Sequence, residues 1–434
     1  MTARARAIAA LGLLALAAGC APARLATTAP AAKPRWTLVA PAGVAQLPDV
    51  QRLIATRRAS ATVEVLSYDR TTGDARSRLE SVRAQLAART QPAPEGGDFI
   101  LIVGSPQAIS MGPWRFEGVE TPVSTDWPLA AGLAPEGETI ARDAWTRALE
   151  RPAPRFIGRI PFDDPGAIAG AVRATLEHAD ATAAARGHAL LASATTGGSW
   201  VLSGPRDRLR ELGWHAQLAG PSGACDRTLA EAAAAPGHGP VLVCTAGPVE
   251  LAPLLASHDP ALVVAFAPAP ALDQAAGLLA SGDLAGVAGF TTAVEASPLS
   301  PALETMRAVP TMLAEGGSIG AVLECTRSAY WNRARGDVAA QLPPVARARA
   351  LAALGAALYG DPAVQVAHSH PAATDAATAA ALPLVVPASE TPAQEPRSPA
   401  EGGGLPSWIW PALVAAAIGG FALLVTATSR RDQQ

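Results

Sequence analysis

The chain has 434 residues, a formal net charge of −3 at pH 7 and four cysteines. A charge this close to zero provides no electrostatic argument for binding nucleic acid or an acidic surface. Between the two terminal segments described next lie about 350 residues, which suffice for one large domain or two medium ones with proper hydrophobic cores.

Residues 1–19 are typical of an export signal. Arg4 and Arg6 form a positive region, an apolar run too short to span a membrane follows, and small residues precede Cys20. The string LAAGC resembles a bacterial lipoprotein box, in which the cysteine, here Cys20, is acylated and becomes the new N-terminus. The alternative is an ordinary secretory signal that happens to end near a cysteine. Residues 20–34, rich in Ala, Pro and Thr, are expected to form a flexible tether.

The other end of the chain predicts a membrane-spanning helix. Residues 409–427 contain no charge, and at about 1.5 Å per residue such a helix is roughly 30 Å long, the thickness of a bilayer core. Trp408 and Trp410 suit the headgroup region on one side, and Arg430 and Arg431 place the C-terminus in the cytoplasm by the positive-inside rule. The main domain is therefore expected outside the cytoplasm of a bacterial cell, attached to the membrane at both ends. A buried core helix is the alternative.

Strands and helices alternate in the first half of the chain. Strand patterns occur in WTLVA, TVEVLSY, DFILIVG and RFIGRI, at residues 36–40, 62–68, 98–104 and 155–160. Helical patterns occupy residues 48–59, 75–90 and 166–186. Because each right-handed crossover between parallel strands needs a covering helix, this order predicts an α/β fold with parallel strands.

The alternation continues in the second half. Strands are expected at residues 199–204, 214–220, 241–246, 261–267 and 286–293, and helices at residues 206–212, 227–234, 302–316, 319–334 and 345–360. A later stretch, rich in Ala, Pro and Thr, is too poor in large apolar residues to fold. The predicted organisation is a signal peptide (residues 1–19), a tether (20–34), two α/β subdomains (35–187 and 188–370), a disordered linker (371–404), a transmembrane helix (405–428) and a cytoplasmic tail (429–434).

Five strings follow one another in a fixed order along the chain: DFILIVGSPQAI from Asp98, TDWPLAAGL from Thr125, RFIGRIPFDDP from Arg155, GGSIGAVLECTRSAY from Gly316 and ALYGDPAVQV from Ala357. Together they resemble the gingipain-type cysteine peptidases of the caspase-like clan. The resemblance covers roughly residues 98–366, and its most specific part is the GRIP string followed by GDP. It implies a caspase/gingipain-like α/β fold with mostly parallel sheets flanked by helices. The chain departs from the family where Leu129 replaces an aromatic residue.

The resemblance also implies where the active site should be. Such peptidases place a histidine after one strand and a cysteine after the next parallel strand, so that the two side chains meet at the carboxyl edge of the sheet. The imidazole keeps the thiol ionised for attack on the substrate carbonyl. In this sequence the histidine position holds Ala246 and the cysteine position holds Ala267. We therefore expect a homologue without its catalytic pair, which binds a peptide or an envelope protein and needs no cofactor.

Two alternatives stay open at this point. His238 lies in a GHG string that precedes a strand instead of following one, and with Cys244 or Cys325 it is a fallback pair for an active cysteine endopeptidase. Cys244 has apolar neighbours and is equally a candidate core residue. A cell-envelope assembly factor with no ligand cleft is the third hypothesis.

Several polar residues in the family-like strings have both a functional and a structural interpretation. Asp126 is expected to approach a substrate cation, as its family counterpart does, or to form an Asx turn before Pro128. Arg159 is a candidate to pair with a carboxylate such as Asp163. Gly360 and the two residues after it are expected to end a helix, with the glycine in the left-handed conformation.

No metal site is expected. His368 and His370 have a spacing that permits metal binding, but they stand at the start of the predicted linker. Asp163 and Asp164 lack the series of oxygen ligands that calcium needs. Besides Cys20, three cysteines remain, which permits at most one disulfide.

Overall fold

The computed structural model describes part of the chain. The described residues are 33–89, 94, 97–151, 155–184, 187–234, 242–246, 249–255, 261–266, 270–291, 308–334 and 344–366, of which 179–184, 265–266, 270–274, 333–334 and 344–347 are described by their backbone alone. Outside them lie Cys20, His238, Ala267, the two histidines of the predicted linker and the predicted membrane-spanning segment. Among the helices in the described ranges, none has the length and apolar character needed to span a bilayer.

The described elements alternate along most of the chain. The strands are β1 (Arg35–Pro41), β2 (Thr62–Tyr68), β3 (Asp98–Val103), β4 (Arg115–Phe116), β5 (Thr139–Ile140), β6 (Arg155–Ile160), β7 (His188–Ser193), β8 (His215–Ala219), β9 (Leu242–Ala246), β10 (Ala261–Phe266), β11 (Leu284–Phe290) and β12 (Ala356–Gly360). The helices are α2 (Ala42–Ala45), α3 (Pro48–Ser60), α4 (Ala75–Ala87), α5 (Trp127–Ala130), α6 (Arg142–Glu150), α7 (Pro165–Ala184), α8 (Thr196–Glu211), α9 (Leu229–Ala233), the 3-10 helix η1 (Ala252–Leu255), α10 (Pro270–Ser281), α12 (Val309–Ala314), α13 (Ile319–Ala334) and α14 (Pro344–Gly355).

Ten of these strands form one sheet in the order β2-β1-β3-β6-β12-β11-β10-β9-β7-β8. The strands form two groups, one on each side of β12. Within each group, neighbouring strands pair in parallel, as the alternation of strands and helices predicts. The late strand β12 lies between β6 and β11 and is antiparallel to β11. It joins the strands of the two expected subdomains, residues 35–187 and 188–370, in a single sheet.

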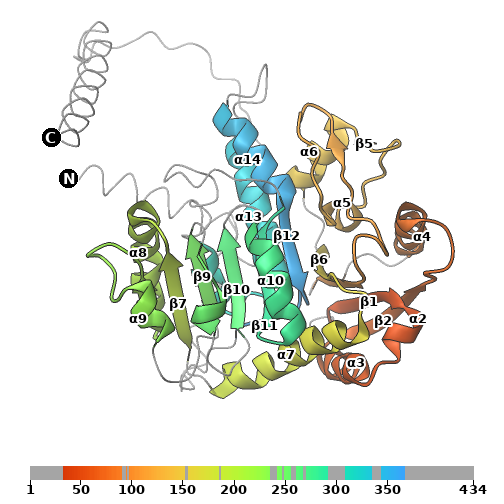
Figure 1. The fold of residues 1–434 in the computed structure, drawn as a ribbon. Helices are drawn as coiled ribbons and strands as arrows, with labels where there is room; N and C mark the ends of the chain where they lie inside the picture. Colours follow the sequence, from red (N-terminus) through yellow and green to blue (C-terminus); the bar gives the residue numbers. More distant parts are fainter. Residues whose placement is uncertain are drawn as a thin grey trace, which may run out of the picture. The chain divides into compact units, whose positions relative to one another are not determined.

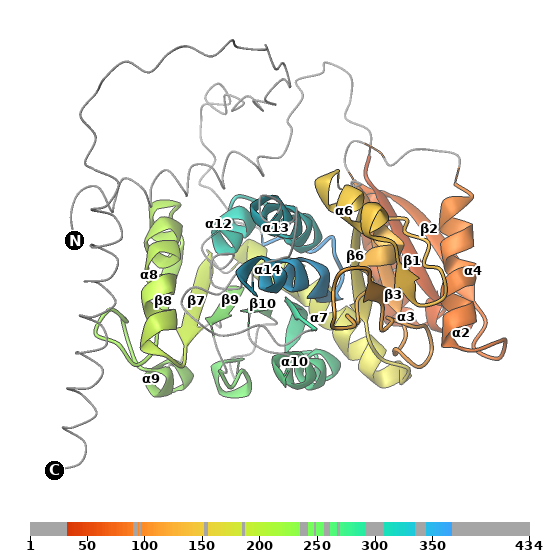
Figure 2. The ribbon, with the colours of Figure 1, turned by 90° about the horizontal axis from the view of Figure 1, so that it is seen from above.

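Helices cover both faces of this sheet, so the described part of the chain has three layers (Figure 1). Figure 2 shows α12, α13 and α14 on one side of the strands and α3, α7 and α10 on the other. Side chains alternate between the two faces along each strand. On β9, for example, Cys244 and Ala246 join the core under α8, α12 and α13, whereas Val243 joins the core under α7 and α10. The mostly parallel α/β fold expected from the sequence is confirmed.

One expected strand is a helix. Residues 199–204 belong to α8, which begins where the Thr195 side chain accepts a hydrogen bond from the Gly198 amide. The strand that precedes α8 is β7, in a segment that the sequence left without a strand. Its HALLAS string is rich in residues that favour helices, and only its pairing between β8 and β9 makes it a strand.

The last expected helix is also different. Residues 345–360 were expected to be helical throughout, but α14 ends at Gly355 and the next five residues are β12. The Ala356–Gly360 segment pairs residue by residue with β11, and this pairing overrides its helical composition. Gly360 has a positive φ of 125°, so it does need the conformational freedom of glycine, but it ends a strand and not a helix.

Candidate functional site

The strands that the family resemblance singles out are neighbours in the sheet. β9 and β10 pair in parallel and end together, with Ala246 in register with Phe266. Ala246 is the last residue of β9 and is 1% exposed. The Ala267 position follows Phe266 directly but lies outside the described residues. At the carboxyl edge of β9, therefore, the side chain is a methyl group, which can neither attack a carbonyl nor move a proton.

Cys244, one of the fallback catalytic residues, lies inside the fold. It is 1% exposed in the middle of β9 and packs in the core under α8, α12 and α13. Burial raises the pKa of its thiol well above that of a free cysteine, because the thiolate is poorly solvated there. This thiol stays protonated at neutral pH, as expected for a small core residue. The position of His238, its proposed partner, is not described.

Asp126 and Arg159 form a buried ion pair. Two hydrogen bonds join them, from Arg159 Nε to Asp126 Oδ2 at 2.7 Å and from Nη2 to Oδ1 at 2.5 Å. The Arg159 side chain is completely buried and that of Asp126 is 8% exposed. The remaining Arg159 nitrogen, Nη1, donates to the carbonyls of Gly104 and Ile109 at 2.8 and 2.9 Å. The guanidinium thus fastens the loop after β3 and the start of α5 to the end of β6.

These contacts replace two expectations from the sequence. Arg159 does not pair with Asp163, which instead binds Arg70 and the hydroxyl of Ser105. Asp126 does not make the local turn either: its side chain caps nothing, and Thr125 Oγ1 accepts the hydrogen bond from the Trp127 amide at 3.2 Å. The carboxylate that the resemblance assigns to a substrate cation is engaged with an arginine of the protein itself.

A second buried polar cluster lies beside this pair. Trp127 Nε1 donates to Glu324 Oε1 at 3.4 Å, and Glu324 also accepts from Arg327. Arg327 donates in turn to the carbonyl of Ala356, the first residue of β12, which is in register with the last residue of β11. Arg159 itself lies near the carboxyl end of β6, in register with Tyr359, which pairs with Val287 in the middle of β11. β9 and β10 are parallel to β11, so Ala246 belongs to the edge at which β11 ends, whereas β6 runs in the opposite direction.

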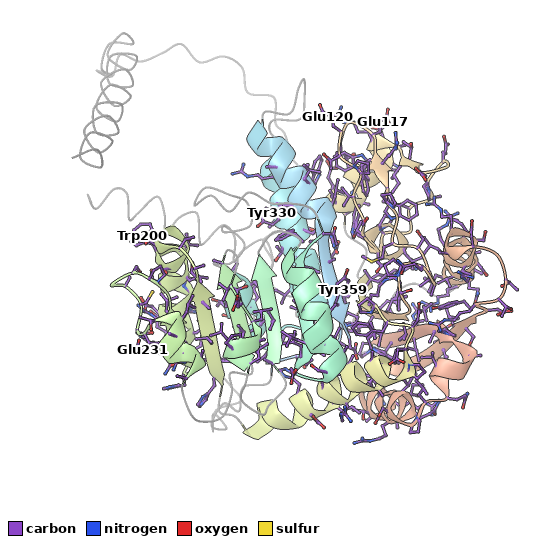
Figure 3. All side chains as sticks on the ribbon, viewed as in Figure 1. Glu117, Glu120, Trp200, Glu231, Tyr330 and Tyr359 are labelled. Carbon is purple, nitrogen blue, oxygen red and sulfur yellow. The ribbon has the colours of Figure 1, made fainter. Side chains whose placement is uncertain are left out.

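The GRIP and GDP strings meet at the centre of the sheet. A Cβ atom on Gly158 would lie 2.3 Å from the Gly360 carbonyl oxygen, so only glycine permits this approach of β6 and β12. The neighbouring Tyr359, in register with Arg159, is labelled on β12 in Figure 3. Asp361, 1% exposed, accepts from Trp36 Nε1 at 3.0 Å and from Arg57 Nε at 2.9 Å. Both strings are architectural in this structure.

Cys225 was not among the site residues predicted from the sequence; it lies after β8 and is partly exposed. Its partial burial by itself raises the pKa, but hydrogen bonds from Ser199 and Ser222 outweigh this, so the pKa of the thiol is lower than in free cysteine. The Ser222 hydroxyl lies 3.4 Å from the sulfur. The signal in the sequence was a Ser-x-x-Cys string directly after a strand. None of the three cysteines in the described ranges is in a disulfide.

A cavity of about 740 Å³ lies beside the start of α4. Asp74, which caps this helix, and Arg76 and Glu80 within it face the loop that contains Pro113 and the loop before β5. Arg76 stacks on Trp114 at 4.1 Å and also donates to the Gly137 carbonyl. In the part of the chain that the structure covers, no three His, Cys, Asp or Glu residues come together as a metal site.

The fold is similar to that of solved cysteine proteinases. The crystal structure of the Arg-specific cysteine proteinase gingipain R (RgpB) matches with a TM-score of 0.53 and 12% identity over 77% of this chain and 79% of that chain. The complex of the pro- and mature domains of RgpB from Porphyromonas gingivalis matches with a TM-score of 0.55 and 12% identity over 77% and 80% of the two chains. No protein-family model and no curated protein matches the sequence. At this level of identity the similarity demonstrates the gingipain/caspase-like fold alone.

Proposed function

We propose that this protein is a non-catalytic homologue of gingipain-type peptidases that binds a peptide or a protein at the edge of its sheet where β9 and β10 end. The observation that carries the proposal is Ala246, which ends β9 in register with the end of β10, where the family resemblance calls for an imidazole. The buried, protonated Cys244 supports the same conclusion, because it provides no thiolate nucleophile.

The neighbouring strand provides an accessible surface for binding. Ser193, the last residue of β7, is in register with Ala246. The residues directly after it, Ala194 and Thr195, are exposed to solvent. A bound peptide would therefore contact the loop between β7 and α8 while it lies across the ends of the parallel strands, the usual ligand position in open α/β sheets.

A binding experiment with two matched variants tests this proposal. Fluorescein-labelled casein peptides are titrated with the full chain in detergent, and binding is followed by fluorescence anisotropy. Ala194→Arg, at the proposed edge, should weaken binding at least about tenfold, or about 1.4 kcal/mol. Ala59→Arg, an equally exposed alanine at the end of α3, should leave binding unchanged. Equal binding by both variants and the parent chain would contradict the proposed surface.

The alternative is an active cysteine peptidase that uses His238 with a nearby thiol. The burial of Cys244 argues against that residue, whereas Cys225 has the accessible thiol with the lowered pKa. Incubation with a thiol-reactive peptidyl probe, followed by peptide mass analysis, separates the two functions. We expect no probe on Cys244 and no effect of His238→Ala on any labelling. Labelling that depends on His238 would favour the enzyme.

We further propose that the chain is held at a bacterial cell membrane, with its main domain outside the cytoplasm. The lipoprotein-type signal before Cys20 and the uncharged residues 409–427 support this. Mass analysis of the mature N-terminus should show a diacylated or triacylated cysteine. Deleting residues 405–434 in a Cys20→Ser chain should release the protein from washed membranes, whereas either change alone should not.

A further inference from the structure

Two histidines lie side by side at the edge of the sheet where β7 and β8 begin, opposite the edge that contains Ala246. His188 begins β7 and His215 begins β8, and the two residues are register partners. Their ring centroids are 4.9 Å apart and the ring planes are inclined by 40°. His215 is exposed and His188 is half-buried. Nothing in the proposed peptide-binding function uses these residues.

A third polar side chain lies on the same face. Gln217 is two residues after His215 on β8, so both side chains point to the same side of the sheet. Its Nε2 atom lies 3.3 Å from His215 Nε2. Rotation of the amide by half a turn would present its oxygen, instead of its nitrogen, to a cation at the imidazole. Two imidazoles and one side-chain amide therefore converge beside the outermost strand.

We propose that His188 and His215 together bind a divalent transition-metal ion, which fastens the edge strand β8 to β7. Metal–imidazole bonds are about 2.0–2.1 Å long, so two nitrogens on one ion lie within about 4 Å of each other. Rings with centroids 4.9 Å apart reach this separation by small side-chain rotations. Imidazole ligands select Ni²⁺, Cu²⁺ and Zn²⁺ over Mg²⁺ and Ca²⁺, which prefer carboxylate oxygens.

The experiment is a calorimetric titration of the full chain in detergent with Ni²⁺. All chains carry His368→Ala and His370→Ala, because the spacing of those histidines permits metal binding of its own. We expect one Ni²⁺ per chain, and at least about a tenfold loss of affinity in both His188→Ala and His215→Ala. His258→Ala, which removes one histidine elsewhere in the chain, is the matched control and should bind as the parent does.

A second measurement keeps the proposal testable if the half-buried His188 cannot be replaced. Ni²⁺ should raise the thermal midpoint of the parent and of the His258→Ala chain, because an ion that binds only the folded state stabilises it. The midpoint of His215→Ala, a change at an exposed position, should not respond to Ni²⁺. Affinity that survives replacement of His215, or that is lost on replacement of His215 but not of His188, would overturn the two-histidine site.

Discussion

The buried pair of Asp126 and Arg159 provides the sharpest test of the structure. Asp126→Ala would leave the Arg159 guanidinium without a counter-charge in a site where its side chain is completely buried. Removing one partner of such a pair costs about 3–5 kcal/mol, because the remaining charge is neither solvated nor compensated. With a urea dependence of about 3 kcal/mol per molar, this corresponds to a fall of at least about 1 M in the unfolding midpoint.

The assay is urea unfolding of the full chain in detergent, followed by circular dichroism. Asp163→Ala is the matched control: its side chain is 42% exposed and also pairs with an arginine, and loss of such a pair costs about 0–1 kcal/mol. Arg159→Met should be at least as damaging as Asp126→Ala, because the carbonyls of Gly104 and Ile109 also lose their donor. The double variant of Asp126 and Arg159 should cost little more than Arg159→Met alone. Equal unfolding midpoints for Asp126→Ala and Asp163→Ala would refute this account of the pair.

Three further changes test other parts of the fold. Asp361→Ala removes a buried carboxylate that accepts hydrogen bonds from an arginine of α3 and a tryptophan of β1. This change should lower the unfolding free energy by about 3 kcal/mol in the same assay. A loss below about 1 kcal/mol would contradict this role. Gly158→Ala should lower the unfolding free energy by about 1–3 kcal/mol, because its Cβ would overlap a carbonyl of β12. Gly204→Ala, at a position with open space around it, is the control and should not destabilise the protein. Equal effects of the two changes would be inconsistent with the close approach of β6 and β12. Iodoacetamide should alkylate Cys225 at a lower pH than free cysteine, because its lowered pKa populates the thiolate at lower pH; peptide mass analysis measures the modification. Cys244 should stay unmodified until the protein unfolds. Equal rates of alkylation at the two cysteines would disprove the assigned environments.

The family-like strings now have a physical explanation that does not depend on catalysis. Gly158 allows β6 to approach β12 closely, Gly360 allows β12 to approach β11, and Asp361 ties the end of β12 to β1 and α3. Asp126 and Arg159 fix the loops at the carboxyl end of β6. These contacts assemble the sheet and would be needed equally by an enzyme and by a protein that only binds. Similar strings are therefore compatible with a site that has lost its nucleophile.

The amino-acid sequence by itself determined the class of fold. The strands β1, β2, β3 and β6 and the helix α13 were predicted within one or two residues of their bounds, because hydrophobic periodicity is a local property. It also located the two strands whose ends form the candidate site, although His238 and Ala267 stay predictions.

Only the tertiary structure decided the remaining features. The AALYG segment is a strand because it pairs with β11. The partner of Asp126 is Arg159 because a loop folds back over β6. The thiol of Cys244 is inert because helices cover β9. Each of these depends on contacts between residues distant along the chain, and local propensity carries no information about such contacts.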